Sequence, residues 1–391
     1  MNRPTVIRAS IAAAFMRTSG LVLALGLGWS PGPAGAQGGS TKGEEARAVE
    51  VSAADRAAAS NVVSRGIHTS GTARVEGVRN VPRTFKANTQ GNLVEVFPRS
   101  RSTTRTEAVG AASATVSAFT GPGFYPDDLS LYAPSGAVIT SAKVYNVFVN
   151  SNGTDFGLPG IFLGHFLNSD FIHLLDQYTG STQNGRYDFV GPLLTQYSIQ
   201  GAQLNDATDI ATIVHAVAAS NGAGYNFIYN VFVPKGIDVC ISTTTGPQCF
   251  SPNNPANWVF CAYHSSVFFS DIGNVYYTVI PYPDQALVSN GGQQYVCDVG
   301  QVDPTTNTAP TPNGVLVDSI SSMLDHELSE TITDPDGDAY LVQNSLVSYL
   351  SEIGDVCINP GYLYTPFAVA GQLYYVQPEY SNTYHACATV P

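Results

Sequence analysis

Lysine and arginine are almost missing from most of this 391-residue chain. Residues 111–391 contain three basic side chains, Lys143, Arg186 and Lys235, against 23 of the 30 acidic residues. The formal charge of this part is therefore near −20. Such a surface repels nucleic acid and anionic membranes and favours cations or cationic partners, so a nucleic-acid partner is excluded.

Long apolar runs are missing as well, and no stretch is apolar for long enough to span a bilayer. The run Leu21–Trp29 follows three arginines and leads into small residues that end at Ala36. This layout predicts a secretory signal peptide over residues 1–36, cleaved after Ala36. We therefore expect a protein that is secreted, extracellular or periplasmic, without a membrane span.

Cysteine is scarce, with six residues that all lie after position 239. An even number of cysteines in an exported protein predicts disulfides. Cys240 and Cys249 flank a short polar loop and form the first predicted pair. Six cysteines allow fifteen pairings, so the others stay open, with a free buried thiol as the alternative for Cys357.

Several signatures of common enzyme classes are absent from the sequence. There is no Gly-x-Ser-x-Gly motif of serine hydrolases and no glycine-rich phosphate-binding loop. The cysteine spacing matches no cysteine-based zinc site. Internal repeats are not evident either.

Residues 37–120 contain few large apolar side chains. A short helix over Val49–Val63 and a short strand over Asn92–Phe97 are the only elements we expect there. The segment is modestly basic and precedes an acidic domain, which leaves two interpretations open. It is either a linker or a removable pro-segment held by charge.

From about residue 138 onward, strand and helix patterns alternate. The pattern predicts an α/β domain over residues 121–391, with a mixed sheet backed by helices. The predicted strands are Lys143–Val149, Gly191–Ile199, Tyr225–Val233, Val267–Phe269, Val275–Ile280 and Gln372–Val376. The predicted helices are Phe171–Tyr178, Asn205–Ser220 and Val315–Thr333.

The helix Val315–Thr333 ends in the motif His326-Glu-Leu-Ser-Glu330. Residues four apart project from the same face of a helix, so this imidazole and this carboxylate can close on one metal ion. In His-Glu-x-x-His metallopeptidases the second position is a histidine and the intervening glutamate is the general base. Here Glu330 takes the place of that histidine, and Glu327 is the candidate base.

Several ordered motifs over residues 140–390 resemble the EXORDIUM, or phosphate-induced protein, family. The motifs are Val231–Cys240, Cys261-Ala-Tyr-His264, Asn313-Gly, Ser319–Glu330 and Glu352-Ile-Gly-Asp355-Val-Cys357. The plant members of that family are extracellular and linked to cell expansion and growth signalling. The resemblance therefore implies an extracellular protein, but it implies no defined chemistry.

The same helix and the downstream glutamate also resemble zincin metallopeptidases whose third ligand is a glutamate. That resemblance implies a zincin-like fold with an active-site helix, and Zn²⁺ held by His326, Glu330 and Glu352. Asp355 then falls where a carboxylate can orient His326. A set of one imidazole and two carboxylates is harder than the usual one, so it also admits Mn²⁺ or Fe²⁺.

If this site holds a metal, Glu327 is expected to accept a proton from the attacking water. An oxyanion also needs a donor, and His264, Tyr340 and His385 are the candidates. Asp336 is an alternative third ligand in place of Glu352.

The sequence thus predicts a secreted metal-dependent hydrolase that acts on a peptide or other amide bond. The alternative is a non-catalytic extracellular protein that binds wall polymers or partner proteins. Substrate and oligomeric state do not follow from the sequence.

Overall fold

The structure, a computed structural model, describes the packed part of the chain in several stretches. They are residues 47–62, 85–87, 93–95, 128–151, 156–243, 246–251, 260–283, 285–287, 293–295, 313–343, 350–357, 365–369 and 372–391. All belong to one compact unit, Glu44–Pro391. The predicted signal peptide lies outside the described residues.

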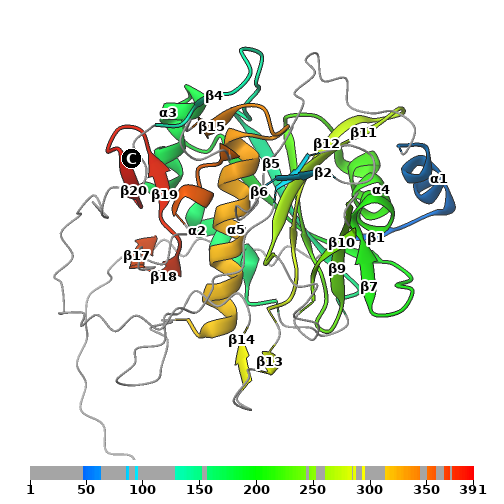
Figure 1. The fold of residues 1–391 in the computed structure, drawn as a ribbon. Coiled ribbons are helices and arrows are strands. Elements are labelled where there is room, and N and C mark those ends of the chain that lie inside the picture. Colours follow the sequence, from blue (N-terminus) through cyan, green and yellow to red (C-terminus); the bar gives the residue numbers. More distant parts are fainter. Residues whose placement is uncertain are drawn as a thin grey trace, which may run out of the picture. The chain divides into compact units, whose positions relative to one another are not determined.

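A six-stranded mixed sheet organises this unit (Figure 1). The strand order is β1 (Arg47–Glu50), β6 (Tyr187–Gln196), β5 (Ala142–Val149), β8 (Phe227–Phe232), β12 (Gly273–Ile280) and β11 (Tyr263–Phe269). The first five strands run parallel, and β11 pairs with β12 in antiparallel fashion. The expectation of an α/β fold with a mixed sheet is confirmed.

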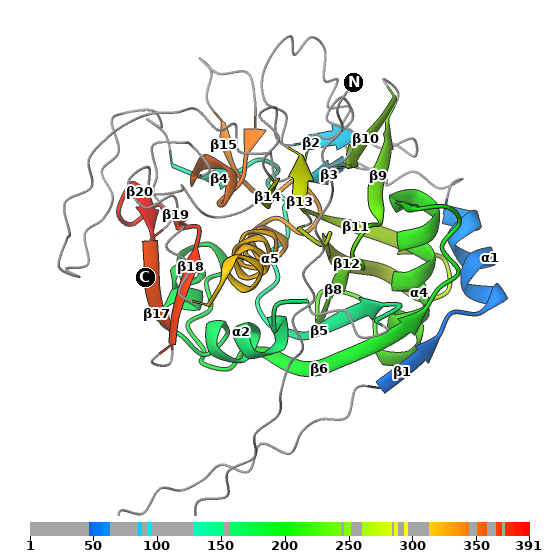
Figure 2. The ribbon, with the colours of Figure 1, turned by 90° about the horizontal axis from the view of Figure 1, so that it is seen from below.

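Helices cover both faces of the sheet (Figure 2). On one face lie α5 (Val315–Thr333), α2 (Pro159–Phe166) and the short helices η1 (Phe171–Leu175) and α3 (Asp176–Thr179). On the other face lies α4 (Ala211–Asn221), which continues a π-helical turn, η2 (Asp206–Ile210), and packs against α1 (Ala53–Val62). The sheet is thus the middle of three layers.

Alternate residues of the central strands supply both cores, because successive side chains of a strand point to opposite faces. In β8, Ile228 and Phe232 join the core on the α5 side. Tyr229 and Val231 join the core on the α4 side. A strand buried on both faces reads as a continuous apolar run, which explains why β8 is recognisable in the sequence.

The first described residues belong to this packed unit. β1 pairs with β6 and extends the sheet, and α1 is tied to α4 through Asp55 and His215, whose Oδ1 and Nδ1 lie 2.7 Å apart. The other ring nitrogen of His215 lies 2.9 Å from Asp271 Oδ2. Residues 47–62 are therefore packed against the domain, and α1 lies within the predicted helix Val49–Val63. The segment is held by the β1–β6 hydrogen bonds and by the buried His215 rather than by apolar side chains, so a low content of apolar residues did not reveal its packing. The linker and the pro-segment over residues 37–120 stay predictions.

The remaining strands form small ribbons around the main sheet. They are β2 (Phe85–Ala87) with β3 (Leu93–Glu95), β7 (Gln203–Asn205) with β9 (Asp238–Thr243) and β10 (Gly246–Phe250), β13 (Gln285–Leu287) with β14 (Gln293–Tyr295), β4 (Ser130–Leu131) with β15 (Tyr340–Gln343) and β16 (Leu350–Ser351), β17 (Thr365–Val369) with β18 (Gln372–Val376), and β19 (Glu379–Ser381) with β20 (Ala386–Ala388).

Two disulfides are defined among the described residues. Cys240 and Cys249 are opposite each other in β9 and β10, which confirms the predicted pair. Cys357, at the end of the short helix η3 (Asp355–Cys357), is bonded to Cys387 in β20. Cys357 is therefore not a free thiol.

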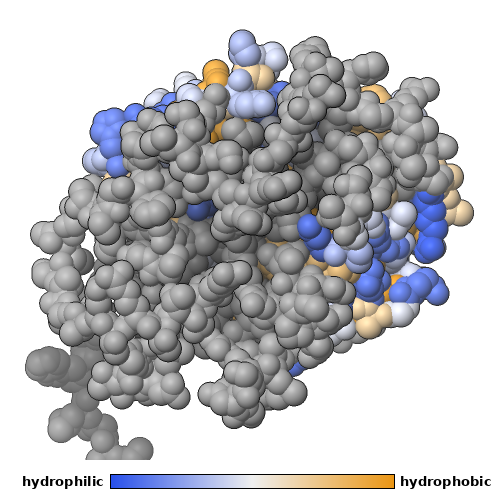
Figure 3. Space-filling view, viewed as in Figure 1, coloured by the Kyte–Doolittle hydropathy of each residue, from blue (hydrophilic) through white to orange (hydrophobic). Residues whose placement is uncertain are grey.

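Among the helices of the described residues, none combines the length and apolarity that crossing a bilayer requires. On the face shown in Figure 3, the coloured residues mix hydrophilic and hydrophobic types. Single exposed apolar side chains such as Leu158 and Ile161 are normal for a surface in contact with water.

Helix α5 matches its predicted bounds, and it is buried around almost its whole circumference. Ile320, Leu324, Leu328 and Ile332 recur at helical spacing and are fully buried. The helix ends at Asp334, which the following proline keeps out of helical geometry. The polar side chains of α5 are thus enclosed as well, and this feature defines the candidate site.

Candidate metal centre

Besides Asp318, which accepts from Asn313, helix α5 carries four ionisable side chains into the interior. Asp325, His326, Glu327 and Glu330 are all 0 % exposed. Burying a carboxylate is costly unless a cation or hydrogen-bond donors compensate for the lost water. The surroundings of these four residues therefore indicate what the cluster binds.

His264, on β11 of the sheet, lies at the end of a row of polar residues and faces the acidic side chains of α5. Asn146, Asn230, Thr278 and His264 are neighbours across β5, β8, β12 and β11. The Asn230 amide donates to Asn146 Oδ1 at 3.1 Å, and the Thr278 hydroxyl donates to Asn230 Oδ1 at 3.0 Å. Paired residues of neighbouring strands share one face of a sheet, so His264 faces α5.

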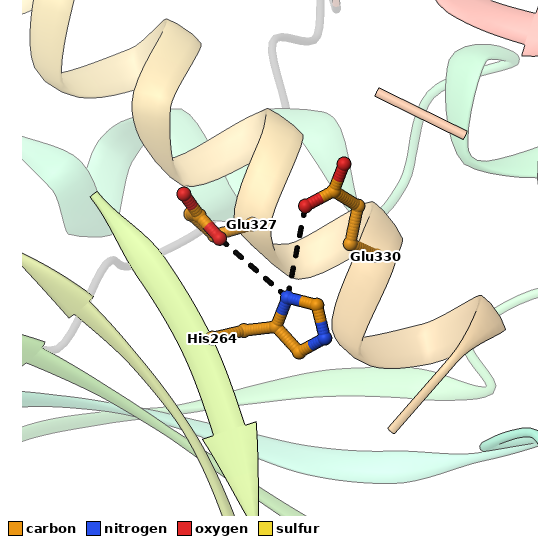
Figure 4. Close-up of side chains that lie close together, drawn as sticks. All are labelled: His264, Glu327 and Glu330. Carbon is orange, nitrogen blue, oxygen red and sulfur yellow. Dashed lines mark ion pairs between the residues drawn. The ribbon is translucent and has the colours of Figure 1, made fainter. Parts of the chain in front are cut away.

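His264 lies between two carboxylates of α5 (Figure 4). Its Nδ1 is 3.6 Å from Glu327 Oε2 and 3.6 Å from Glu330 Oε2. Its Nε2 donates to the carbonyl oxygen of Asp334 at 3.3 Å. The His264 ring is thus held by backbone on one side and presents its other nitrogen to two acids.

His326 faces the other oxygen of the same glutamate. Its Nε2 lies 3.1 Å from Glu330 Oε1 and 3.9 Å from Asp355 Oδ1. The amide of Gln377 donates to His326 Nδ1 at 3.1 Å and to the carbonyl of Gly354 at 2.5 Å. The backbone N–H of Asp355 donates to Glu330 Oε1 at 3.2 Å. Glu330 therefore lies between two imidazoles, one on each carboxylate oxygen.

Gly354 allows the segment before η3 to approach α5 this closely. A Cβ at this position would lie 2.3 Å from His326 Nδ1 and 2.8 Å from Glu330 Oε1. Any side chain here would push the segment away from the helix. Steric contact with His326 and Glu330 therefore explains why the Glu352-Ile-Gly-Asp355 motif has glycine at position 354.

The structure groups the predicted ligands in a different way from the sequence. Donor atoms of His326, Glu330 and Asp355 all lie within 4.8 Å of one another, and so do those of His264, Glu327 and Glu330. Glu352 belongs to neither group of described residues, and its Oε1 lies 3.8 Å from His264 Nε2. Asp355, expected to orient His326, is thus the carboxylate grouped with His326 and Glu330.

The alternative third ligand, Asp336, is engaged by hydroxyl groups. Its carboxylate accepts from Ser266 at 2.9 Å, from Tyr225 at 2.5 Å and from Tyr276 at 3.3 Å. It is in neither candidate metal group of the described residues. These hydrogen bonds hold the turn that follows α5, so Asp336 has a structural role there.

Two candidate oxyanion donors have other partners. His385 has a 72 % exposed side chain and pairs with Asp128 at 2.8 Å. The ring of Tyr340 packs edge-on against that of Tyr178. Of the three candidate donors, His264 alone lies beside Glu327 and Glu330.

No role follows from the sequence for three members of the cluster, Gln377, Asp325 and Glu379. Both carboxyl groups are 0 % exposed and have no hydrogen-bond partner among the described residues. Asp325 adjoins the motif and was visible in the sequence. Gln377 and Glu379 follow β18 and have no recognisable spacing to α5, so only the fold brings them there.

The pKa values of the buried carboxyl groups depart from their ordinary values because these groups lie away from water and close together. Burial raises the pKa of Glu327 to about 7, against the opposing effect of His264. Burial also favours the neutral form of Glu330, yet His326 and His264 outweigh it and lower the Glu330 pKa to about 2. For His264, the adjacent Glu327 and Glu330 overcome burial and raise its pKa to about 10. Burial raises the pKa of Glu352 and Glu379 well above the ordinary value.

Acidic groups outnumber basic ones around α5. Apart from Asp318 in the first turn, seven carboxyl groups are buried there: Asp325, Glu327, Glu330, Asp334, Glu352, Asp355 and Glu379. Two imidazoles face them, and no lysine or arginine among the described residues forms an ion pair with them. Arg186 pairs with Asp176, Lys235 lies over the ring of Tyr282, and Lys143 is exposed. A divalent cation fits this donor set of imidazole and carboxylate groups.

The disulfide Cys357–Cys387 secures this arrangement, because Cys357 is two residues from Asp355. We expect the double variant Cys357→Ala/Cys387→Ala to lower the free energy of unfolding by about 3–4 kcal/mol, the value for closing a loop of this length. It should also weaken metal binding. The matched control is Cys240→Ala/Cys249→Ala, which opens a loop of 9 rather than 30 residues. Urea unfolding and metal titration of both variants check this, and equal metal affinity in both would contradict it.

No family model, no curated protein and no solved structure matches this chain. The resemblances to the EXORDIUM and zincin families therefore stay predictions. The geometry of the α5 cluster and its chemistry are the basis for a function.

Proposed function

We propose that this protein is an exported metal-dependent hydrolase of peptide or other amide bonds. The proposal keeps the zincin-like interpretation of α5 and the EXORDIUM resemblance of residues 140–390. The single observation that carries it is the position of Glu330, whose carboxylate lies against His326 with Asp355 beside them. Such a set of one imidazole and two carboxylates is suited to Zn²⁺, Mn²⁺ or Fe²⁺.

The ion would be held by His326, Glu330 and Asp355. A tetrahedral site with bonds of about 2.0–2.1 Å separates its donors by roughly 3.3 Å. The 3.1 Å between His326 and Glu330 is close to that value, and the 3.9 Å between His326 and Asp355 requires a small closing movement. When bound, the ion supplies Lewis acidity, which polarises a carbonyl group and makes water more acidic.

The residues around this set have separate tasks. Glu327, one position after His326, is the proton acceptor, since neither of its oxygens has a hydrogen-bond partner among the described residues. A base works best with a pKa near the pH at which it acts, and burial brings Glu327 to about 7. Binding of an ion at His326 Nε2 places the ring proton on Nδ1, where Gln377 lies 3.1 Å away. The Gln377 oxygen, which has no hydrogen-bond partner among the described residues, can accept this proton once the amide turns over. His264 Nδ1 lies 3.6 Å from Glu327 Oε2, beside the base.

Two further observations support the wider proposal. Disulfides persist in oxidising compartments, and two of them are present in the described residues. The acidic surface favours a cationic or basic substrate over an anionic one. The competing function, binding of wall polymers or partners without catalysis, predicts the same fold but no turnover.

The first test is the metal content of the full chain, measured by elemental mass spectrometry together with cleavage of a quenched peptide library. We expect at least one transition-metal ion per chain, and cleavage that a chelator abolishes and Zn²⁺ or Mn²⁺ restores. His326→Ala should weaken metal binding by at least about 100-fold. His385→Ala, which removes an exposed imidazole, should keep the metal.

Absence of any ion in the wild-type protein, even after incubation with Zn²⁺ and Mn²⁺, would refute the proposal. A bound ion without cleavage of peptides or simple amides would favour the binding function instead.

A further inference from the structure

We infer that the cluster binds a second divalent cation, held by His264, Glu327 and Glu330, so that Glu330 bridges two ions. This inference rests on the proposed function, which supplies the first ion at His326, Glu330 and Asp355. It assigns His264 as a metal ligand in place of the oxyanion donor expected from the sequence.

The bridging position of Glu330 is the first argument. Its Oε1 lies 3.1 Å from His326 Nε2, and its Oε2 lies 3.6 Å from His264 Nδ1. The two groups of three donors share only this carboxylate. Paired metal ions in hydrolytic sites are about 3.5–4 Å apart. A single carboxylate that turns one oxygen to each imidazole suits such a pair.

The orientation of the His264 ring is the second argument. Its Nε2–H donates to the carbonyl of Asp334, the residue that ends α5. In the neutral ring, the lone pair is then on Nδ1, the nitrogen that faces Glu327 and Glu330. Metal-binding histidines usually donate their other ring N–H to a backbone carbonyl or carboxylate in this way. His264 is thus already oriented as a ligand.

Glu327 is the third argument. It is 0 % exposed and neither oxygen has a hydrogen-bond partner in the described part of the chain. Its Oε2 points toward His264 Nδ1, where a cation would satisfy both. Its Oε1 stays available for a proton, so Glu327 keeps its role as base.

The space between His264, Glu327 and Glu330 is suited to a small cation. The side chains of His264, Glu327 and Glu330 are at most 3 % exposed, so their donor atoms face one another rather than solvent. Neither oxygen of Glu327 has a hydrogen-bond partner among the described residues, and the same holds for Glu330 Oε2 and His264 Nδ1. One imidazole and two carboxylates form a second hard donor set, which suits Mn²⁺, Fe²⁺ or Zn²⁺.

The test counts ions in the full chain and in single variants. Metal-free protein is titrated with Mn²⁺, bound ions are counted by elemental mass spectrometry, and the electron paramagnetic resonance spectrum is recorded. We expect two ions per chain and a spin-coupled signal from the wild type. His264→Ala and His326→Ala should each keep one ion and lose the coupling, whereas His385→Ala should keep both ions.

The outcomes separate this inference from the proposed function. One ion in the wild type, retained in His264→Ala and lost in His326→Ala, overturns the second site and leaves the proposed function in place. One ion that is lost in His264→Ala and retained in His326→Ala overturns both assignments. No ion overturns both as well. If a variant does not fold, the coupled signal of the wild type still decides, because two separate ions do not produce it.

Discussion

Glu327→Gln is expected to lower the rate of metal-dependent amide hydrolysis by about 1000-fold, within the usual range for loss of a general base. Glutamine has nearly the same shape but cannot accept the proton. The ion at His326, Glu330 and Asp355 should be retained, because Glu327 is not in that group. The measurement is kcat on a peptide substrate, with metal content determined on the same sample.

The matched control is Asp188→Asn, which neutralises an exposed carboxylate on β6. It should leave kcat, metal content and thermal stability unchanged. A Glu327→Gln variant with full activity would remove Glu327 from the mechanism. A variant that loses all its metal together with its activity would show that Glu327 acts as a ligand of the first ion.

The metal-free protein is expected to lose stability as the pH rises from 5 to 8. Glu327, with its pKa raised to about 7, and Asp334, with its pKa raised by burial to about 6, hold protons in the folded state that the unfolded chain releases. Where the folded state binds more protons, stability falls with rising pH. Despite burial, Glu327 and Glu330 raise the pKa of His264 from 6.5 to about 10, so above pH 6.5 the folded state also keeps this proton and stability falls further. Glu330 has a lowered pKa, so its contribution is lost only in stronger acid.

A difference of one pKa unit between the folded and unfolded states changes the free energy of unfolding by about 1.4 kcal/mol. Burial raises the pKa of Glu327 from 4.5 to about 7 and that of Asp334 from 3.8 to about 6, so the melting temperature of the metal-free protein should fall by at least about 5 °C between pH 5 and 8. Differential scanning fluorimetry of metal-free and metal-loaded protein checks this. The loaded protein should show the opposite slope, because protons compete with the ion for the same ligands. Glu379→Gln, which mimics the protonated form of a buried acid, should flatten the metal-free slope. A metal-free protein whose stability rises from pH 5 to 8 would contradict the expectation.

Much of the central fold was predictable because its signals are local. β5, β8 and β12 are runs of β-branched and aromatic residues, and α5 has apolar residues at helical spacing up to a proline. The helix α2 was missed, since Pro159–Phe166 is apolar on all sides and its periodicity is weak. β1 was missed because its four residues gain their stability from β6, which the local sequence does not reveal.

The candidate site was predictable only where it lies on one element. His326, Glu327 and Glu330 are close in sequence, and helical geometry alone places them together. His264 was singled out by a motif, but its position between Glu327 and Glu330 depends on the register of β11 against β12. The close approach of Asp355 to His326 depends on the turn that Gly354 permits, and no periodicity encodes that turn.

The docking of β1 and α1 has a consequence for maturation. A protease that cut anywhere between Val62 and Asp128 would sever the chain without separating its parts, since β1 is hydrogen-bonded to β6 and Asp55 is bonded to His215. The mature molecule would then consist of two polypeptides that stay together until denatured. If the short piece were stripped away, the bare edge of β6 would invite pairing between molecules. The residues of β1 thus protect the edge of β6 against self-association.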